Sequence, residues 1–255
     1  MPETSAIAAL GAALLALALL LVPGWLMLRL VRVRGLLALA IAPACSTAVL
    51  ASGAILAQLV GVRWSLPVAG GSAVLGLAVA LLVRRLTTEA PPSPRVSRAD
   101  GALIGAGLLL AVVPTLAAMR SIDAYLQRWD AVFHLAALQL VADSGSASSL
   151  TLGALSYGSG QAAIYPAGWH ALGSLLPGSP TAALTIAATV TSALPWVLGS
   201  AALATQLARG SSARTTTGIG VAGVGGLLAG IVTATPMSLW TGWGHVPNAA
   251  ALAML

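Results

Sequence analysis

The fold class follows from residues 7–28, which read IAALGAALLALALLLVPGWLML. This run carries no charge and exceeds the roughly 20 apolar residues that a helix needs to cross a bilayer. Arg29 follows the run, and no basic residue precedes it. A cleaved signal peptide has the opposite arrangement, with a basic start and a small-residue cleavage site at its end. We therefore expect a retained membrane-spanning helix.

Apolar runs of similar length recur along the chain. The predicted spans cover residues 6–28, 36–60, 66–83, 101–119, 181–207 and 216–235. Of the 255 residues, 58% are hydrophobic and only 7% are charged, and the mean hydropathy is +0.95. A soluble domain of this size needs far more charge on its surface. The sequence therefore predicts an all-α, polytopic transmembrane helical bundle whose immediate partner is the lipid bilayer.

The arginines indicate the orientation of this bundle. Nine of them follow the first, third and fifth apolar runs: Arg29, Arg32, Arg34, Arg84, Arg85, Arg95, Arg98, Arg209 and Arg214. Loops rich in arginine stay in the cytoplasm. We therefore expect a multi-pass protein of the inner (plasma) membrane, with its N-terminus and the 120–180 loop extracytoplasmic. Arginines clustered at helix ends argue against a nucleic-acid partner.

The 120–180 loop holds most of the ionisable side chains outside these clusters. Four polar side chains recur there at helical spacing: Asp123, Gln127, Asp130 and His134. Steps of four, three and four residues place them on one helix face. A second face carries Leu126, Trp129, Phe133, Ala136 and Leu140. We expect an amphipathic helix of about 20 residues, ending near Gly145, in the plane of the membrane interface.

A second short helix is predicted later in the same loop. Pro166 suits a first helical turn, and the breakers in residues 177–180 would end the helix after about Leu176. Two interfacial helices in one outer loop would roof a cavity between spans. That arrangement suits a lipid-linked substrate that enters sideways.

Residues 128–134 (RWDAVFH), Gly145 and residues 165–168 (YPAG) resemble the first external loop of the GT-C glycosyltransferases, including the catalytic subunits of oligosaccharyltransferases. The chain is also similar to an uncharacterised family of actinobacterial membrane proteins with DAxFHLA and YPAGWH motifs. In the GT-C fold this loop follows the first span, whereas three extra spans precede it here. Residues 1–100 would then be three N-terminal spans with a basic cytoplasmic loop, and residues 101–255 the start of a GT-C-like core. The apolar run 248–255 is too short to cross a bilayer, so we expect an N-terminal part of a longer protein.

The resemblance implies an integral membrane glycosyltransferase. It would move a sugar from a polyprenyl-phosphate donor to a cell-envelope acceptor on the outer face. Asp130 matches the catalytic acid by position, Asp123 is the competing choice, and His134 is a candidate base or ligand. A divalent cation bound by Asp130 and His134 could offset the charge of the leaving phosphate. The structural alternative is an Asp130–His134 surface pair worth a few tenths of a kcal/mol.

The candidate substrate-binding residues are Arg128, Tyr165, Trp169, His170 and His245. Arg128 has the fork geometry for phosphate, although its side chain could equally extend to lipid headgroups. Trp169 offers a ring face to a sugar. The three histidines share one side of the membrane, so a three-histidine zinc site is conceivable, although their spacing does not require one.

Two functions from other classes stay open. A transporter or flippase for a lipid-linked envelope precursor would need polar or charged groups within the spans. The predicted spans offer little beyond Gln58, Gln206 and scattered hydroxyls, which counts against ion coupling. The other alternative is a non-catalytic membrane assembly partner, with the outer helices binding protein.

Overall fold

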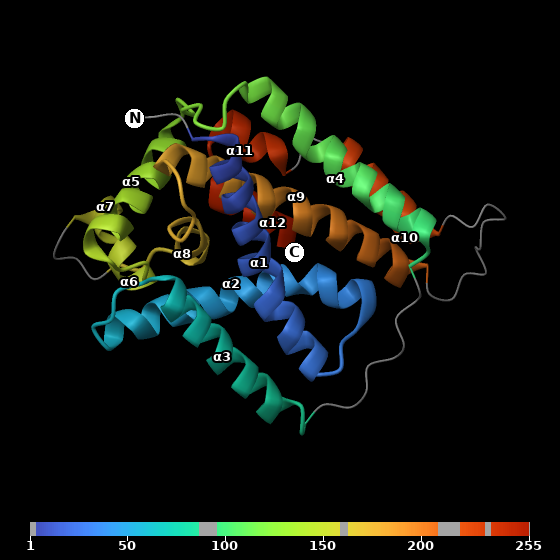
Figure 1. The fold of residues 1–255 in the computed structure, drawn as a ribbon, viewed down its shortest axis with the longest axis horizontal. Helices are drawn as coiled ribbons and strands as arrows, with labels where there is room; N and C mark the ends of the chain where they lie inside the picture. Colours follow the sequence, from blue (N-terminus) through green and yellow to red (C-terminus); the bar gives the residue numbers. More distant parts are fainter. Residues whose placement is uncertain (1–3, 87–95, 159–162, 209–219, 233–235, 255) are drawn as a thin grey trace.

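A computed structural model describes residues 4–86, 96–158, 163–208, 220–232 and 236–254 of the chain (Figure 1). Across these ranges every regular element is a helix. Helices long and apolar enough to cross a membrane are α1 (Ala6–Leu30), α2 (Gly35–Leu59), α3 (Leu66–Val83), α4 (Arg98–Met119) and α9 (Pro180–Leu207). They agree with the first five predicted spans to within a few residues. The chain is a polytopic helical membrane protein, as its composition predicts.

Helix α9 lies at the centre of the bundle (Figure 1). In its most apolar stretch, 83% of the residues are buried within the protein. The corresponding share is 11–33% for the other four span-length helices, whose remaining surface is free to face lipid. Helices α1, α2, α4, α10 (Val221–Ile231) and α12 (Val246–Met254) all pack against α9. The central helix therefore positions both the spans and the shorter helices at the end of the bundle.

The sixth predicted span, residues 216–235, is wrong in length. Helix α10 has 11 residues, which at 1.5 Å per residue makes a helix of roughly 16 Å, too short to cross a bilayer. Residues 216–219 and 233–235 lie outside the described residues. Glycine is the poorest helix former apart from proline, and α10 is rich in it because its role is close packing.

The close packing in question joins α10 to α4. A side chain on Gly230 would overlap the backbone of Gly107, and one on Gly107 would overlap the backbone of Gly226. Gly226 and Gly230 therefore allow the two helix backbones to approach, and small residues four apart in the sequence are typical of such packing.

Four short helices form one end of the molecule, together with α11 (Met237–Trp243) (Figure 1). They are α5 (Trp129–Ser144), α6 (Ser149–Leu152), α7 (Ala154–Tyr157) and α8 (Gly168–Gly173). The loop between α2 and α3 docks beneath them. The Trp64 backbone N–H donates to the Gly145 carbonyl at 2.8 Å, and its indole N–H donates to the Ala171 carbonyl at 2.9 Å.

Hydrogen bonds at the two ends of the bundle agree with the predicted alternation of the spans. At one end, Asp123 accepts hydrogen bonds from Thr4 and Ser179, so the start of the chain, the 120–180 loop and the start of α9 lie together. At the other end, Asp100 joins the start of α4 to the start of α10. Which of these ends faces the cytoplasm stays a prediction of the arginine pattern.

Asp100 caps two helices with a single carboxylate. Its Oδ2 accepts from the Ser97 N–H at 3.1 Å in a capping box, and its Oδ1 accepts from the N–H groups of Gly220 at 2.7 Å and Gly223 at 3.1 Å. The residue is only 4% exposed. Asp100 therefore accepts hydrogen bonds from backbone N–H groups at the starts of two helices. Such groups have no partner within their own helix.

We predict that Asp100→Ala lowers the unfolding free energy by about 2–3 kcal/mol, because buried donors on two helices lose a charged acceptor. Thermal unfolding in detergent measures this loss. Asp143→Ala is the matched control, since Asp143 is exposed and its carboxylate accepts only from Gln139 of its own helix. Equal melting temperatures for the two variants would contradict the double-cap role.

Candidate functional site

Helix α5 begins later than the sequence pattern predicts. Its first residue is Trp129, with Arg128 at the N-cap. Asp123 and Gln127 precede the helix, so the predicted single face of four polar side chains is wrong. The reason is tertiary: Asp123 is held by hydrogen bonds outside its own segment.

Asp123 ties three segments of the chain together. Its Oδ2 accepts from the Thr4 backbone N–H at 2.7 Å, and its Oδ1 accepts from the Thr4 hydroxyl at 2.9 Å and from the Ser179 hydroxyl. These donors, Ser179 first among them, lower the pKa of Asp123 below its usual range. A carboxylate with its oxygens engaged in this way is suited to holding structure, and it is less suited to accepting a substrate proton.

The exposed and buried faces of α5 also differ from the prediction. Trp129, expected on the apolar face, is 94% exposed, whereas His134, expected to face water, is only 2% exposed. With His134, α5 buries Ala131, Ala137, Leu138 and Val141. The helix thus presents its second turn, through His134, to the interior of the bundle.

Helix α8 lies inside the bundle instead of in a surface roof. It begins two residues after Pro166, and Trp169 to Gly173 are all buried against α2, α5 and α9. A side chain on Gly168 would crowd Thr47 of α2, and one on Gly173 would crowd Leu138 of α5. Two glycines therefore allow this short helix to pack closely against its neighbours. The predicted second helix is present, but it ends at Gly173 and is buried by protein, so it forms no exposed roof.

Two buried histidines join α5 to α8. His134 Nδ1 and His170 Nε2 lie 3.0 Å apart, a hydrogen-bond distance. The ring of Trp169 stands perpendicular to that of His170 at 5.1 Å, and Tyr165 lies 4.9 Å from Phe133. The Trp169 indole N–H donates to the Thr191 hydroxyl of α9 at 3.2 Å. An aromatic shell encloses the pair and fixes it to the central helix.

Both imidazoles are neutral at physiological pH. Burial lowers the pKa of His134 to about 4, with Asp130 partly opposing the shift and His245 adding to it. Burial and the neighbouring His134 lower the pKa of His170 to about 3. One ring donates and the other accepts, so the pair needs no charge. The second ring nitrogen of His170, Nδ1, is buried without a hydrogen-bond partner.

The exposed part of the site is an Asp130–His245 pair. Asp130 Oδ2 and His245 Nε2 lie 3.3 Å apart, and their side chains are 47% and 41% exposed. Asp130 stands in the first turn of α5, and His245 stands in the turn between α11 and α12. Gly244 adopts a left-handed conformation (φ 80°) and packs against the backbone of Ala131. This contact brings the α11–α12 turn onto the start of α5.

Asp130 has fewer side-chain partners than Asp100 and Asp123. Asp100 and Asp123 each accept at least three hydrogen bonds, and Asp143 accepts one from Gln139. Asp130 has His245 as its side-chain partner and keeps about half of its surface accessible. The structural alternative, an Asp130–His134 surface pair, is not what the structure shows, because His134 is buried and Asp130 pairs with His245. Asp130 is therefore more accessible than Asp100 and Asp123, and unlike the exposed Asp143 it lies beside an imidazole.

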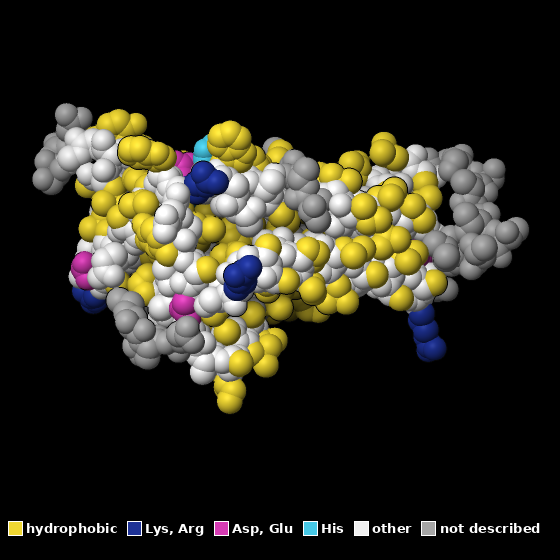
Figure 2. All heavy atoms as spheres, turned by 90° about the horizontal axis from the view of Figure 1, so that it is seen from above, with side chains coloured by type: hydrophobic (Ala, Val, Ile, Leu, Met, Phe, Trp, Pro, Cys, Tyr) yellow, Lys and Arg dark blue, Asp and Glu magenta, His cyan; other side chains and the backbone are white. Residues whose placement is uncertain are grey.

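The surface around this pair combines charge with large apolar side chains. Figure 2 shows a histidine and an acidic side chain side by side, next to a basic side chain and large hydrophobic groups. Of the three histidines, His245 is partly exposed, whereas His134 and His170 are buried. Arg128 is exposed beside Asp130, whereas Trp169 is only 5% exposed. Arg128 can reach a ligand in solvent, but Trp169 cannot offer its ring to one.

Tyr165 contributes to the wall behind the site. Its pKa is raised by partial burial and by the charge of Asp130, and its backbone N–H donates to the Ser149 carbonyl at 2.9 Å. Its ring lies 5.7 Å from that of His170. It therefore links the buried histidines to the start of α6.

The histidines divide into a buried pair and one surface residue instead of converging on one point. In the described part of the chain no group of three His, Cys, Asp or Glu side chains is placed to hold a metal ion. The described residues therefore do not form the conceivable three-histidine zinc site.

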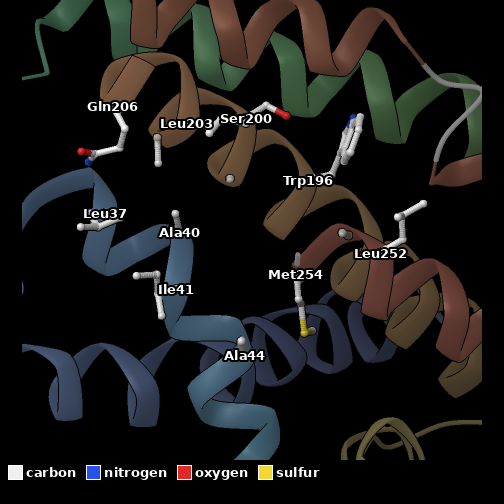
Figure 3. Close-up of a pocket in the computed structure, with 13 residues that line it drawn as sticks. Leu37, Ala40, Ile41, Ala44, Trp196, Ser200, Leu203, Gln206, Leu252 and Met254 are labelled. Carbon is white, nitrogen blue, oxygen red and sulfur yellow. The ribbon is translucent and has the colours of Figure 1, made fainter. Parts of the chain in front are cut away.

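A separate pocket lies between α2, α9 and α12, with a volume of about 290 Å³ (Figure 3). Its lining is aliphatic apart from Trp196, Ser200 and Gln206, as Figure 3 shows around Leu37, Ile41 and Leu203. It carries no acid, base or cation. The lining of this pocket therefore offers no ionisable side chain, unlike the Asp130–His245 region.

These features define a polytopic helical membrane protein with an acid–imidazole site at one end of its bundle. Residues 17–255 match DUF6541, which is described as a family of unknown function, and the chain belongs to that family. No curated protein and no solved structure shows significant similarity to it.

Two features of the structure went unpredicted. The double cap of Asp100 was one, although the Ser97-x-x-Asp100 spacing of a capping box marks the start of α4. The exposed ring of Trp243, two residues before His245, was the other. No local pattern separates Trp243 from the buried Trp240, because tertiary packing decides which indole is covered.

We predict that the protein loses stability as the pH falls from about 6.5 to about 4. The folded pKa values of His134 and His170 lie below the ordinary histidine value of 6.5. The unfolded chain therefore binds protons first, and the contribution of the neutral pair is complete above pH 6.5 and declines below it. Melting temperatures across this range measure the effect.

A double variant, His134→Gln with His170→Gln, should flatten this pH dependence, because glutamine does not titrate. His245→Gln is the control and should leave the slope largely intact, since His245 is exposed. A slope that persists unchanged in the double variant would contradict the assignment.

The structure also separates the two candidate acids. Asp123→Asn should lower the melting temperature by about 2–4 °C, the shift expected for roughly 1 kcal/mol in a chain of this size. Thermal unfolding in detergent measures this shift, with Asp143→Asn as the control on an exposed acid. A melting temperature that stays unchanged in Asp123→Asn would contradict the structural role.

Proposed function

We propose that the protein is an integral membrane glycosyltransferase of the GT-C type. It transfers a sugar from a polyprenyl-phosphate donor to a cell-envelope acceptor at the extracytoplasmic face. The observation that carries this proposal is the half-exposed Asp130–His245 pair at the end of the bundle. The GT-C-like order of Asp130, Phe133, Gly145 and the YPAG turn supports it.

The geometry suits a single displacement. Asp130 accepts the proton of an acceptor hydroxyl as the oxygen forms its bond to the anomeric carbon. The bond between that carbon and the phosphate oxygen breaks, and the electron pair leaves with the phosphate. One displacement inverts the anomeric configuration. The proton then passes from Asp130 to solvent, which reaches the residue directly.

His245 and Arg128 have supporting roles in this reaction. His245 orients the Asp130 carboxylate through its Nε2, since the two atoms lie 3.3 Å apart. Arg128, exposed at the start of α5, offers positive charge to the donor phosphate. A divalent cation would add further charge there, but Asp130 and His245 supply only two ligands. No step is therefore assigned to a metal ion.

The described spans argue against an ion-coupled transporter. Their charged side chains are Arg29 near the end of α1 and Arg98 and Asp100 at the start of α4. Coupling carboxylates in transporters lie near the middle of the bilayer, where α2, α3 and α9 carry no charge. The acid of interest lies at the bundle end instead.

The decisive variant is Asp130→Asn, which keeps the shape of the side chain and removes its basicity. We expect transfer to fall by about 100-fold or more, the usual cost of losing a general base. The assay follows radiolabelled polyprenyl-phosphate sugars and envelope acceptors with the protein in lipid nanodiscs.

Asp143→Asn is the matched control, because Asp143 is an exposed acid on the same helix. His245→Gln should give a smaller loss than Asp130→Asn. Full transfer by a stably folded Asp130→Asn protein would exclude Asp130 as the base.

A further inference from the structure

We propose that Trp243 and Trp129 bind the ring face of the transferred sugar and thereby hold it against the Asp130–His245 pair. This inference rests on the proposed function and assigns its sugar subsite. It replaces Trp169, which the structure buries, as the source of the aromatic surface.

The two indoles are the exposed tryptophans of the described chain. Trp129 is 94% exposed and Trp243 is 69% exposed, whereas Trp64, Trp169 and Trp240 are all below 9%. The remaining tryptophans are partly buried and contact the protein: Trp25 stacks with Arg29, and Trp196 donates to the Ala229 carbonyl. The described protein therefore leaves two large apolar rings uncovered, and such rings commonly mark a binding surface.

Both exposed indoles belong to the segments that carry the reactive pair. The centroids of the Trp243 and His245 rings lie 6.5 Å apart, with an interplanar angle of 34°. Trp129 directly precedes Asp130 in the first turn of α5. Gly244 packs on Ala131 and so keeps these two segments in contact. A ligand at Asp130 therefore has an indole available from each segment.

A sugar fits this combination of groups. One face of a sugar ring presents C–H bonds, which carry partial positive charge and meet the negative face of an indole favourably. The ring edge presents hydroxyls, which bond to carboxylate and imidazole. A hydrocarbon chain would satisfy the indoles only and would leave Asp130 and His245 desolvated.

Charge also argues that these rings face water. Trp129 stands between the exposed Arg128 and the half-exposed Asp130, neither of which enters hydrocarbon readily. Figure 2 shows charged side chains beside large hydrophobic ones on this face. Anchoring in the lipid interface is the competing role for an exposed tryptophan, and the experiment separates the two.

The test uses Trp243→Leu and Trp129→Leu in lipid nanodiscs. Saturation-transfer NMR with methyl α-mannopyranoside, methyl β-glucopyranoside and methyl α-arabinofuranoside reports contact between the protein and sugar C–H groups. We expect each Leu variant to lose most of the signal and to raise the donor KM about tenfold, with kcat changed by less than about twofold. Trp243→Phe should restore part of the signal, because it restores an aromatic face.

Tyr157→Leu is the matched control, since Tyr157 is 58% exposed on α7, away from the reactive pair. It should leave sugar contact and KM unchanged. Unchanged KM and NMR signal in both Trp variants would overturn the sugar subsite. The sugar subsite would also be overturned if the Trp variants and Tyr157→Leu all inserted less well into the membrane while contact with the sugar stayed intact.

Failure of the proposed function gives a different result. Wild-type protein that transfers no sugar from any polyprenyl-phosphate donor, yet shows saturation transfer that depends on Trp243, would refute the transferase alone. Active wild type with Trp variants of normal KM would refute the sugar subsite alone. Asp130→Asn should keep the NMR signal while losing transfer.

Discussion

The hydrogen bond between His134 and His170 fixes the end of the bundle on which the candidate site depends. It joins α5 to α8, and α8 is itself packed against the central helix α9. Without that bond, α5 would lose its buried polar anchor, and its first turn carries Asp130. Two neutral imidazoles are suited to this place because a charged pair would carry a large desolvation cost. The position of the exposed acid is thus set by two histidines that never meet solvent.

Carboxylates with the same intrinsic chemistry take different roles here because their partners differ. Asp100 and Asp123 are saturated with hydrogen bonds from backbone and hydroxyl donors, which binds separate segments together at opposite ends of the bundle. Asp130 meets a single imidazole at 3.3 Å and remains open to water. A proton acceptor needs a free oxygen that a hydroxyl can approach. The number of hydrogen-bond partners and the exposure of the side chain, more than sequence position, therefore distinguish Asp130 from the structural residues Asp100 and Asp123.

The sequence predicts the parts of this structure that depend on local composition. Apolar runs identify the five span-length helices, and the glycine and alanine spacing of α10 predicts its close packing. Helical spacing misplaces Asp123, because its position depends on Thr4 and Ser179, far away in the chain. Burial of α8 depends on glycine contacts with α2 and α5. The pairing of Asp130 with His245 likewise crosses most of the C-terminal half of the chain, and no periodicity reports such a contact.

The membrane explains why the reactive groups gather at one end of the molecule. Charged groups are costly among the spans, and α2, α3 and α9 carry none. Imidazole can lose its charge by releasing a proton, so His134 and His170 enter the apolar interior. The proposed transfer needs a carboxylate that solvent and substrate can reach, and the side chain of Asp130 is about half exposed at the end of the bundle. Two neutral, buried histidines therefore support the turn that carries this exposed acid.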